Sequence, residues 1–156
     1  MTTVLLKDLL DLAQMENGKF KINRALTHLP SVFERSIHTL KQRLENKKIT
    51  VEVMDNSAVS EFLNQVFIDA DRMNQVMTNL ISNAIKFSKK GQSLSLITRV
   101  TGHTVLDRDS VDVTDEEKEF LEQIEESKDD DYKPVRANFE FGVQDYGTGM
   151  TEDQMK

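Results

Sequence analysis

The sequence predicts an α+β fold, an α/β sandwich with helices on one face of a mixed β-sheet. Segments with apolar residues at helical spacing alternate with segments in which every second residue is apolar, as in strands. They follow one another in the order β-α-β-α-β with short connections, which is typical of a sheet layered against helices. The 156 residues, 38% of them hydrophobic, suffice for one domain with a buried core.

The first segment, residues 4–16, is predicted to be a helix. Leu5, Leu9 and Leu12 lie on one stripe of it, so this helix needs an apolar partner. We expect it to end at Asn17-Gly18, because glycine readily takes the left-handed conformation that follows many helices.

Two strands and a second helix are expected next. FKIN, residues 20–23, alternates like a short strand, and HLPS, residues 28–31, is typical of a turn. An amphipathic helix is predicted from Val32 to about Lys48. ITVEVM, residues 49–54, is rich in β-branched residues and predicts a strand, which Asp55-Asn56-Ser57 would end.

A third, central helix is predicted after a short extended piece at Phe67-Ile68. Asp69 can cap its N-terminus, and the apolar spacing continues to Phe87. Lys89-Lys90-Gly91 predicts a turn, and residues 93–100 predict another strand. The buried face of this helix is expected to consist of Val76, Met77, Leu80, Ile81 and Ala84.

The formal net charge of -7 comes from one acidic insertion, at about residues 103–137. From His103 to Arg136 there are 13 Asp and Glu against 5 Lys and Arg, a net charge of -8 that leaves +1 for the rest. A nearly neutral body argues against nucleic acid as a partner, because phosphate binding needs clustered Lys and Arg. Thr114 to Glu117 match a capping box that would open a short amphipathic helix. The insertion is either an acidic docking surface or a loop that tolerates extra residues.

Composition excludes several other kinds of site. The chain has no cysteine, and therefore no disulfide, thiolate metal site or cysteine nucleophile. The N-terminus lacks the basic start and the continuous apolar run of a signal peptide. No segment approaches the about 18 consecutive apolar residues of a membrane span.

The stretch NQVMTNLISNAIKF, residues 74–87, carries amide side chains at steps of four. Gln75, Asn79 and Asn83 share one face of the predicted helix, with Lys86 one step round. An amide carbonyl suits Mg²⁺, which takes only one or two protein groups beside the phosphates of a substrate. A lysine adds positive charge for the same phosphates. The alternative is the solvent-facing flank of an ordinary amphipathic helix.

A second stretch, FEFGVQDYGTGM at residues 139–150, is an alternating strand followed by a glycine-rich turn. The strand is expected to stop at Asp145, whose carboxylate can accept a hydrogen bond from the exocyclic amine of a base. Gly147 and Gly149 would let the backbone approach a flat ring or a phosphate without a Cβ collision. Alone, this pattern also describes any strand that ends in a glycine turn.

The two stretches together are specific. The chain carries D-x-x-R from Asp69, Q-V-M-x-N-L-I-x-N-A-I-K-F from Gln75 and D-x-G-x-G from Asp145. In this order the motifs resemble the ATP-binding domain of sensor histidine kinases, which implies the Bergerat-type ATPase fold also found in type II topoisomerases, mismatch-repair ATPases and a heat-shock chaperone. DLLDLAQMENGKFKI, residues 8–22, looks like the end of a second dimerisation helix joined to that domain, as in hybrid kinases.

The resemblance implies two parts and a set of site residues. Residues 1–18 would be the end of the dimerisation helix, and residues 19–156 an ATP-binding domain that is incomplete at its C-terminus. The roles implied are Mg²⁺ ligand for Asn83, phosphate contact for Asn79 and Lys86, pocket wall for Phe87, adenine-amine acceptor for Asp145 and pocket floor for Gly147 and Gly149.

The reaction implied is transfer of the ATP γ-phosphoryl group to a histidine and onward in a two-component phosphorelay. In the hydrolysing relatives a glutamate stands four residues before the metal-binding asparagine, where this chain has Asn79. An amide cannot serve as a general base, whose loss costs a factor of roughly 10² to 10⁴. Two alternatives are a degenerate module that binds nucleotide or only dimerises, without kinase activity, and a hydrolysing ATPase, which Asn79 disfavours.

The acceptor histidine of the family is expected outside this chain, because His28, His38 and His103 lack its helical and acidic context. We therefore expect a piece of a longer kinase, with little activity alone and no catalytic residue of its own. Expected partners of the parent protein are ATP with Mg²⁺, a second copy through the dimerisation helices, and a response-regulator receiver domain. The expected location is a cytoplasmic domain, and the sequence leaves open whether the parent is membrane-anchored.

Overall fold

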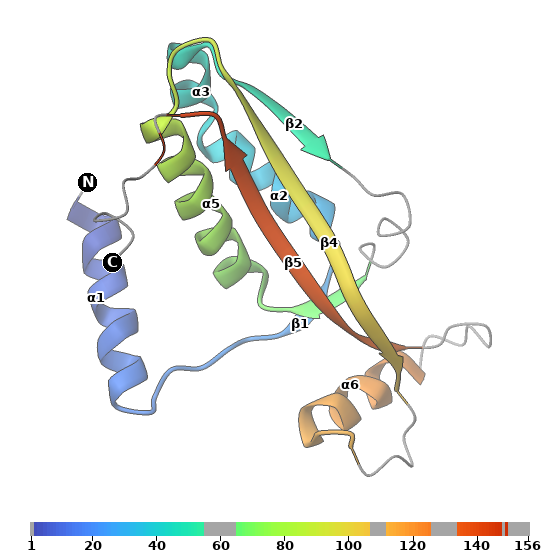
Figure 1. The fold of residues 1–156 in the computed structure, drawn as a ribbon. Helices are drawn as coiled ribbons and strands as arrows, with labels where there is room; N and C mark the ends of the chain where they lie inside the picture. The colour runs from blue at the N-terminus through green and yellow to red at the C-terminus, as the bar shows by residue number, and fades with distance from the viewer. Residues whose placement is uncertain (1, 55–64, 107–111, 126–133, 148, 150–156) are drawn as a thin grey trace.

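A computed structural model of the chain describes residues 2–54, 65–106, 112–125, 134–147 and 149 (Figure 1). The expected break at residues 55–57 lies outside the described residues. The helices and strands, in chain order, are α1 (Thr2–Glu16), β1 (Ala25–Thr27), α2 (Leu29–Thr39), α3 (Lys41–Lys47), β2 (Thr50–Met54), β3 (Val66–Ile68), α5 (Ala70–Phe87), β4 (Ser93–Val105), α6 (Asp115–Glu125) and β5 (Val135–Asp145).

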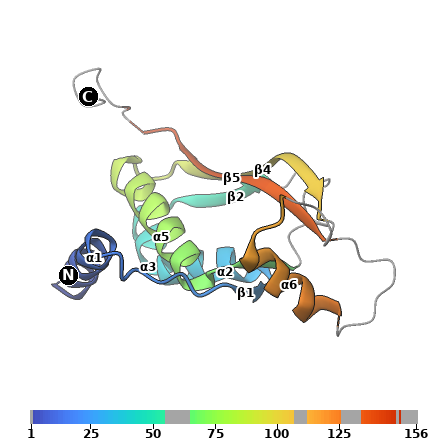
Figure 2. The ribbon, with the colours of Figure 1, turned by 90° about the horizontal axis from the view of Figure 1, so that it is seen from below.

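The main sheet is mixed, as the sequence predicts. Its strand order is β2-β4-β5, with β2 parallel and β5 antiparallel to β4. A second sheet pairs β1 with β3 in antiparallel fashion. Helices α2, α3 and α5 lie on one face of the main sheet, which Figure 2 shows from the side. The predicted α+β class, with helices on one face of a mixed sheet, is confirmed.

The core lies between the helices and β4. One cluster joins α3 and α5 to the sheet, and its buried members are Leu40, Leu44, Ile49, Ile81, Ala84, Ile85, Leu94 and Leu96. A second cluster joins α2 to α5 through Leu29, Val32, Phe33 and Met77. Apolar burial on this scale is the main stabilising contribution to the fold, and it holds α5 against the sheet along most of its length.

The predicted buried face of α5 is partly wrong. Met77, Ile81 and Ala84 are buried, but Val76 is 53% exposed and Leu80 is 40% exposed. Each residue turns an α-helix by about 100°, so both lie on a flank beside the amide stripe. Ile85, on the opposite flank, is 2% exposed and completes the core face.

Two other expectations are shifted along the chain. Residues 20–23 form no strand, and the strand is β1, because residues 25–27 are the ones that pair with β3. The second helix begins earlier, at Leu29, with Pro30 in its first turn. Proline is tolerated there because a backbone N–H in the first turn would have no partner within the helix. The second helix is also divided, since Leu40, with φ -103° and ψ 4°, separates α2 from α3.

Helix α1 ends as predicted, and its apolar stripe stays open. Gly18 has φ +64°, the left-handed conformation expected after the helix. Leu9 and Leu12 are 62% and 54% exposed, so the described part of the chain does not supply the apolar partner that the stripe needs. No helix among the described residues is long and apolar enough to cross a membrane.

The acidic insertion continues the β4–β5 hairpin and then folds back as α6. The predicted capping box is present, since the Glu117 amide donates to Thr114 Oγ at 3.3 Å and the Thr114 amide donates to Glu117 Oε2 at 2.8 Å. Phe120 stacks on Phe67 of β3 at 4.8 Å between ring centroids. The Arg136 guanidinium is the largest cause that lowers the pKa of Glu117 to about 2. The described part of the insertion is therefore packed against the body, although residues 129–131 lie outside the described residues.

Candidate functional site

The N-terminal end of α5 is tied to other parts of the chain. Asp69 caps the helix, with Oδ1 accepting from the Arg72 amide at 3.0 Å and Oδ2 accepting from the Asn23 amide at 2.8 Å. These backbone hydrogen bonds, above all the one from Arg72, lower the pKa of Asp69. The carboxylate therefore connects the start of α5 to the linker, the segment between α1 and β1 that contains Asn23.

Arg72 extends the same connection to α1. Its guanidinium forms an ion pair with Asp11 of α1 and lies 4.6 Å from the centroid of the Phe20 ring. Gln75 accepts from Arg72 at 3.2 Å and donates to Asp11 at 3.4 Å. The hydrogen bond to Asp11 is the main cause that raises the pKa of Arg72. Gln75, the first amide of the predicted stripe, therefore has a structural role.

The C-terminal half of α5 presents the rest of the stripe to solvent. Asn79, Asn83 and Lys86 are exposed, and their side chains make no hydrogen bond within the described part of the chain. Phe87 is 49% exposed, and the Lys86 ammonium lies 5.2 Å from the centroid of its ring. Two amides, an ammonium group and an aromatic face thus stand together on a helix whose opposite side is buried.

The D-x-G-x-G motif, which starts at Asp145, ends β5 in a tight turn. Asp145 Oδ1 accepts from the Gly147 amide at 2.8 Å, and Oδ2 has no hydrogen-bond partner among the described residues. A Cβ at Gly147 would lie 2.5 Å from the Phe87 carbonyl oxygen and 2.7 Å from Asp145 Oδ1, so only glycine fits there. Gly149 has φ +69° with nothing within 4 Å of a built Cβ.

The two motifs meet at one edge of the molecule. Gly147 lies directly against the carbonyl group of Phe87, and Figure 1 shows the ends of α5 and β5 side by side. Gln92 adds a second link, because its Nε2 donates to the Tyr146 carbonyl at 2.5 Å while its Oε1 accepts from the Lys89 amide at 2.5 Å. The arrangement places the exposed polar groups of α5 beside the Asp145 carboxylate on a fixed backbone.

Sequence reasoning missed two residues that fix this junction. Gln92 is one, and Lys47 at the end of α3 is the other, with its Nζ donating to three backbone carbonyls at the C-terminus of α5. Neither has a sequence signal of its own, because a glutamine in a turn and a lysine at a helix end are common.

The chemistry available at the junction suits a polar, anionic ligand. The exposed amides and ammonium group can bind oxygen atoms of a phosphate, and Asp145 can accept from an amine. Among the described residues, no group of three or more His, Asp or Glu side chains could hold a metal ion. A metal here would need ligand phosphates beside the amide oxygen of Asn83, as Mg²⁺ commonly does.

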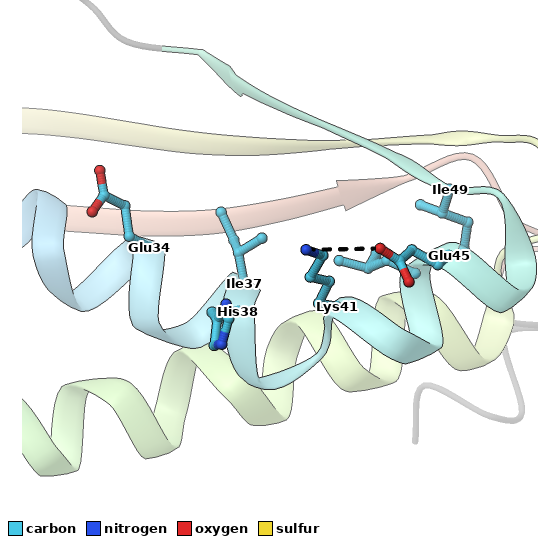
Figure 3. A pocket seen from close by; sticks show the side chains of 7 residues that line it. Glu34, Ile37, His38, Lys41, Glu45 and Ile49 are labelled. Carbon is cyan, nitrogen blue, oxygen red and sulfur yellow. Dashed lines mark ion pairs between the residues drawn. The ribbon is translucent and has the colours of Figure 1, made fainter.

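A groove in the described part of the chain lies elsewhere. It has a volume of about 340 Å³ and opens between α2, α3 and the start of β2 (Figure 3). Ile37, Leu44 and Ile49 form its apolar lining, and the Lys41–Glu45 ion pair, at 4.0 Å, lies along it. None of the predicted site residues lines this groove.

The curated relatives of the chain are signalling proteins. The virulence sensor protein BvgS of Bordetella bronchiseptica is 36% identical over 94 residues, which are 60% of this chain and 7% of that protein. Hybrid signal transduction histidine kinase G of Dictyostelium discoideum is 33% identical over 88 residues, 56% of this chain and 2% of that protein. The chain is homologous to sensor histidine kinases. No protein-family model matches it.

The curated relatives are much longer than this chain. The non-motile and phage-resistance protein of Caulobacter vibrioides is 28% identical over 152 residues, covering 94% of this chain but 17% of that protein. Among solved structures, the Acinetobacter baumannii histidine kinase AdeS has a TM-score of 0.48 and 23% identity, covering 70% of this chain and 57% of that one. The catalytic domain of histidine kinase ThkA has a TM-score of 0.42 and 13% identity, covering 60% of this chain and 69% of that one.

Proposed function

We propose that this chain forms the ATP- and Mg²⁺-binding part of a histidine protein kinase. The observation that carries the proposal is the contact between Gly147 and the Phe87 carbonyl, which brings the two predicted nucleotide motifs to one edge of the fold. Homology to sensor histidine kinases supports the same assignment independently of that contact.

The residues at the junction fit a nucleotide. Asn83 would offer its amide oxygen to Mg²⁺, while Asn79 and Lys86 would bind the phosphates. Asp145 would accept a hydrogen bond from the adenine amine through Oδ2, since Oδ1 is held by the Gly147 amide. Phe87 would form a wall of the pocket, and the open space at Gly149 would let the backbone approach the ligand. Bound Mg²⁺ would neutralise charge on the phosphates.

The residues of α5 favour transfer over hydrolysis. Its acidic residue Asp71 lies in the first turn, and from Arg72 to Phe87 the helix has no carboxylate. Water near Asn83 would therefore find no general base on this helix. Positioning by Asn79 and charge neutralisation by Lys86 would suit the attack of a histidine nitrogen on the γ-phosphorus, with the bond to the leaving β-phosphate oxygen broken and ADP released.

The remaining partners belong to the parent protein. We propose that it dimerises through α1, because Leu9 and Leu12 are 62% and 54% exposed and need an apolar cover. We further propose that it passes the phosphoryl group to a receiver domain, as the name of the hybrid kinase relative suggests. A cytoplasmic location of this part would follow from that role.

The test is a titration of the chain with a fluorescent ATP analogue, with and without Mg²⁺. Asn83→Ala should weaken Mg²⁺-dependent binding by about 10-fold or more, since the amide ligand is lost. Asp145→Asn should weaken binding with or without Mg²⁺, because adenine recognition does not involve the metal. Thr101→Ala, an exposed change in the outer part of β4, is the control. Binding that is unchanged in both site variants would refute the assignment.

A further inference from the structure

We infer that Lys47 is a positioning residue for the nucleotide site, through the backbone that carries Lys86 and Phe87. This inference rests on the proposed function. Lys47 is the last residue of α3, and none of the predicted roles includes it. Its Nζ group hydrogen-bonds to backbone carbonyls and to no predicted ligand-binding side chain, so we expect an effect on binding to pass through the α5 backbone.

The Lys47 ammonium group lies at the C-terminus of α5. Lys47 Nζ donates to the carbonyls of Ile85 at 2.7 Å, Lys86 at 3.1 Å and Ser88 at 2.9 Å. These carbonyls belong to the last turn of α5 and its cap, which otherwise lack helical partners. The Lys47 carbonyl also accepts from the Gly91 amide at 2.9 Å, so one residue holds both sides of the turn after α5.

Three features make this contact more than ordinary capping. An ammonium group has three donors, and here each has a carbonyl acceptor. The residue is half-buried, so water competes poorly for the same carbonyls. The helix end that it holds carries both Lys86 and Phe87, and the Phe87 carbonyl is the group against which Gly147 lies.

The consequence for function is geometric. Without the Nζ group, the last turn of α5 would lose the charge-assisted bonds that fix it, and positive charge at a helix C-terminus would be lost as well. The Lys86 ammonium and the Phe87 ring would then sample more orientations, and the Gly147 turn would lose its fixed neighbour. Ligand binding would have to restore that order, which lowers affinity.

The test compares Lys47→Met, which keeps the aliphatic stem, with Lys47→Arg and with Lys41→Met. Lys41 lies on the same helix with an exposed side chain, and its replacement removes the same charge. Two quantities are measured on the folded chain: the dissociation constant of a fluorescent ATP analogue with Mg²⁺, and the exchange rate of the Ser88 amide hydrogen, which donates to the Ala84 carbonyl at 2.9 Å.

Lys47→Met should weaken analogue binding about 10-fold and speed Ser88 exchange about 10-fold. Each change is about what the loss of one charge-assisted hydrogen bond produces. Lys47→Arg should recover part of both effects, and Lys41→Met should change neither. A double-mutant cycle with Lys86→Met should give less than the sum of the two single losses, because Lys47 acts through Lys86.

The outcomes separate this inference from the proposed function. Tight binding by Lys47→Met, or losses that add fully with Lys86→Met, would overturn the positioning role while leaving the nucleotide site intact. A wild-type chain that binds no nucleotide would overturn the proposed function and this inference together. Faster Ser88 exchange with unchanged affinity would show that Lys47 only stabilises the helix, which also overturns the inference.

Discussion

At the N-terminal end of α5, the side chains of Asp69, Arg72 and Gln75 are hydrogen-bonded to α1, to the linker or to the helix itself. At the C-terminal end, Asn79, Asn83 and Lys86 are exposed and make no such bonds within the described part of the chain. At this end the connections to the rest of the fold are made through backbone groups of α5, such as the carbonyls that accept from Lys47. Polar residues of one helix thus serve structure at one end and leave groups available to a ligand at the other.

The difference shows how a binding surface can be exposed and still ordered. Side chains that bind a ligand need donors or acceptors that are still free, whereas the backbone that carries them must be fixed. Lys47, Gln92 and Gly147 fix the backbone at the C-terminal end of α5 without occupying its polar side chains. At the N-terminal end the polar side chains make the connections themselves.

The largest expected effect concerns the C-terminal junction. Gly147→Ala would place a methyl group 2.5 Å from the Phe87 carbonyl oxygen, so the turn or the end of α5 must move. We expect a loss of about 1–3 kcal/mol in the free energy of unfolding, together with weaker binding of an ATP analogue. Urea unfolding and the fluorescence titration measure the two effects.

The matched control lies in β5, the strand that leads into this turn. A Cβ at Gly142 would meet Ile97 Cβ at 3.9 Å, an ordinary contact, so Gly142→Ala should change stability little. Equal behaviour of the two variants would mean that the close approach at residue 147 does not hold the junction, and the contrast between the two ends of α5 would lose its structural basis.

A smaller effect is expected at the N-terminal end. Arg72→Ala removes the ion pair with Asp11 and the contact with the Phe20 ring, whose side chains are only partly exposed. We expect a loss of about 1 kcal/mol in the free energy of unfolding, since a partly exposed pair is weakened by solvent. Amide exchange in α1 should become faster, while affinity for an ATP analogue should stay within about 2-fold of wild type.

Asn83→Ala should behave in the opposite way. It removes an exposed side chain without hydrogen bonds to described residues, so stability should stay within about 0.5 kcal/mol of wild type while Mg²⁺-dependent binding falls. If Arg72→Ala reduced nucleotide affinity as strongly as Asn83→Ala, the division of α5 into a structural end and a ligand-binding end would be wrong.

The sequence predicted more of the fold than of the packing. Apolar spacing located the helices and most of the strands, because periodicity reflects burial. It misplaced Val76 and Leu80, since apolar side chains beside a polar stripe look like core side chains in a sequence. It also misplaced the strand at residues 20–23, because β1 is decided by pairing with β3, which is distant in the chain.

The candidate site shows the same limit. The sequence motifs identified the exposed residues of α5 and the turn at Asp145. That these residues bind a nucleotide stays a prediction. The contacts that hold these residues could not be predicted, because Lys47 lies 38 residues from the Ile85 carbonyl that it binds. Gln92 likewise lies 54 residues from the Tyr146 carbonyl. Pairings over such separations depend on the tertiary fold.

The smallest expected effect sharpens the comparison through pH. The pKa of Asp69 is lowered in the folded chain from its ordinary value of 3.8, mainly by the Arg72 amide. A lowered pKa contributes stability that is fully present above pH 3.8 and is lost as pH falls through the folded-state pKa. Asp69→Asn keeps a capping oxygen but cannot ionise, so it should cost about 0.5–1 kcal/mol at pH 7, and this cost should shrink as the pH falls below 3.8 and through the folded-state pKa.

The measurement is the difference in free energy of unfolding between wild type and Asp69→Asn at several pH values. The difference is needed because Glu117, whose pKa is lowered to about 2 by Arg136, loses its own contribution in the same range in both proteins. A gap that stayed constant from pH 7 to pH 2 would show that the ionised carboxylate is not what holds the linker to α5. The charge of Asp69 would then be no part of what distinguishes the N-terminal end of α5 from its C-terminal end.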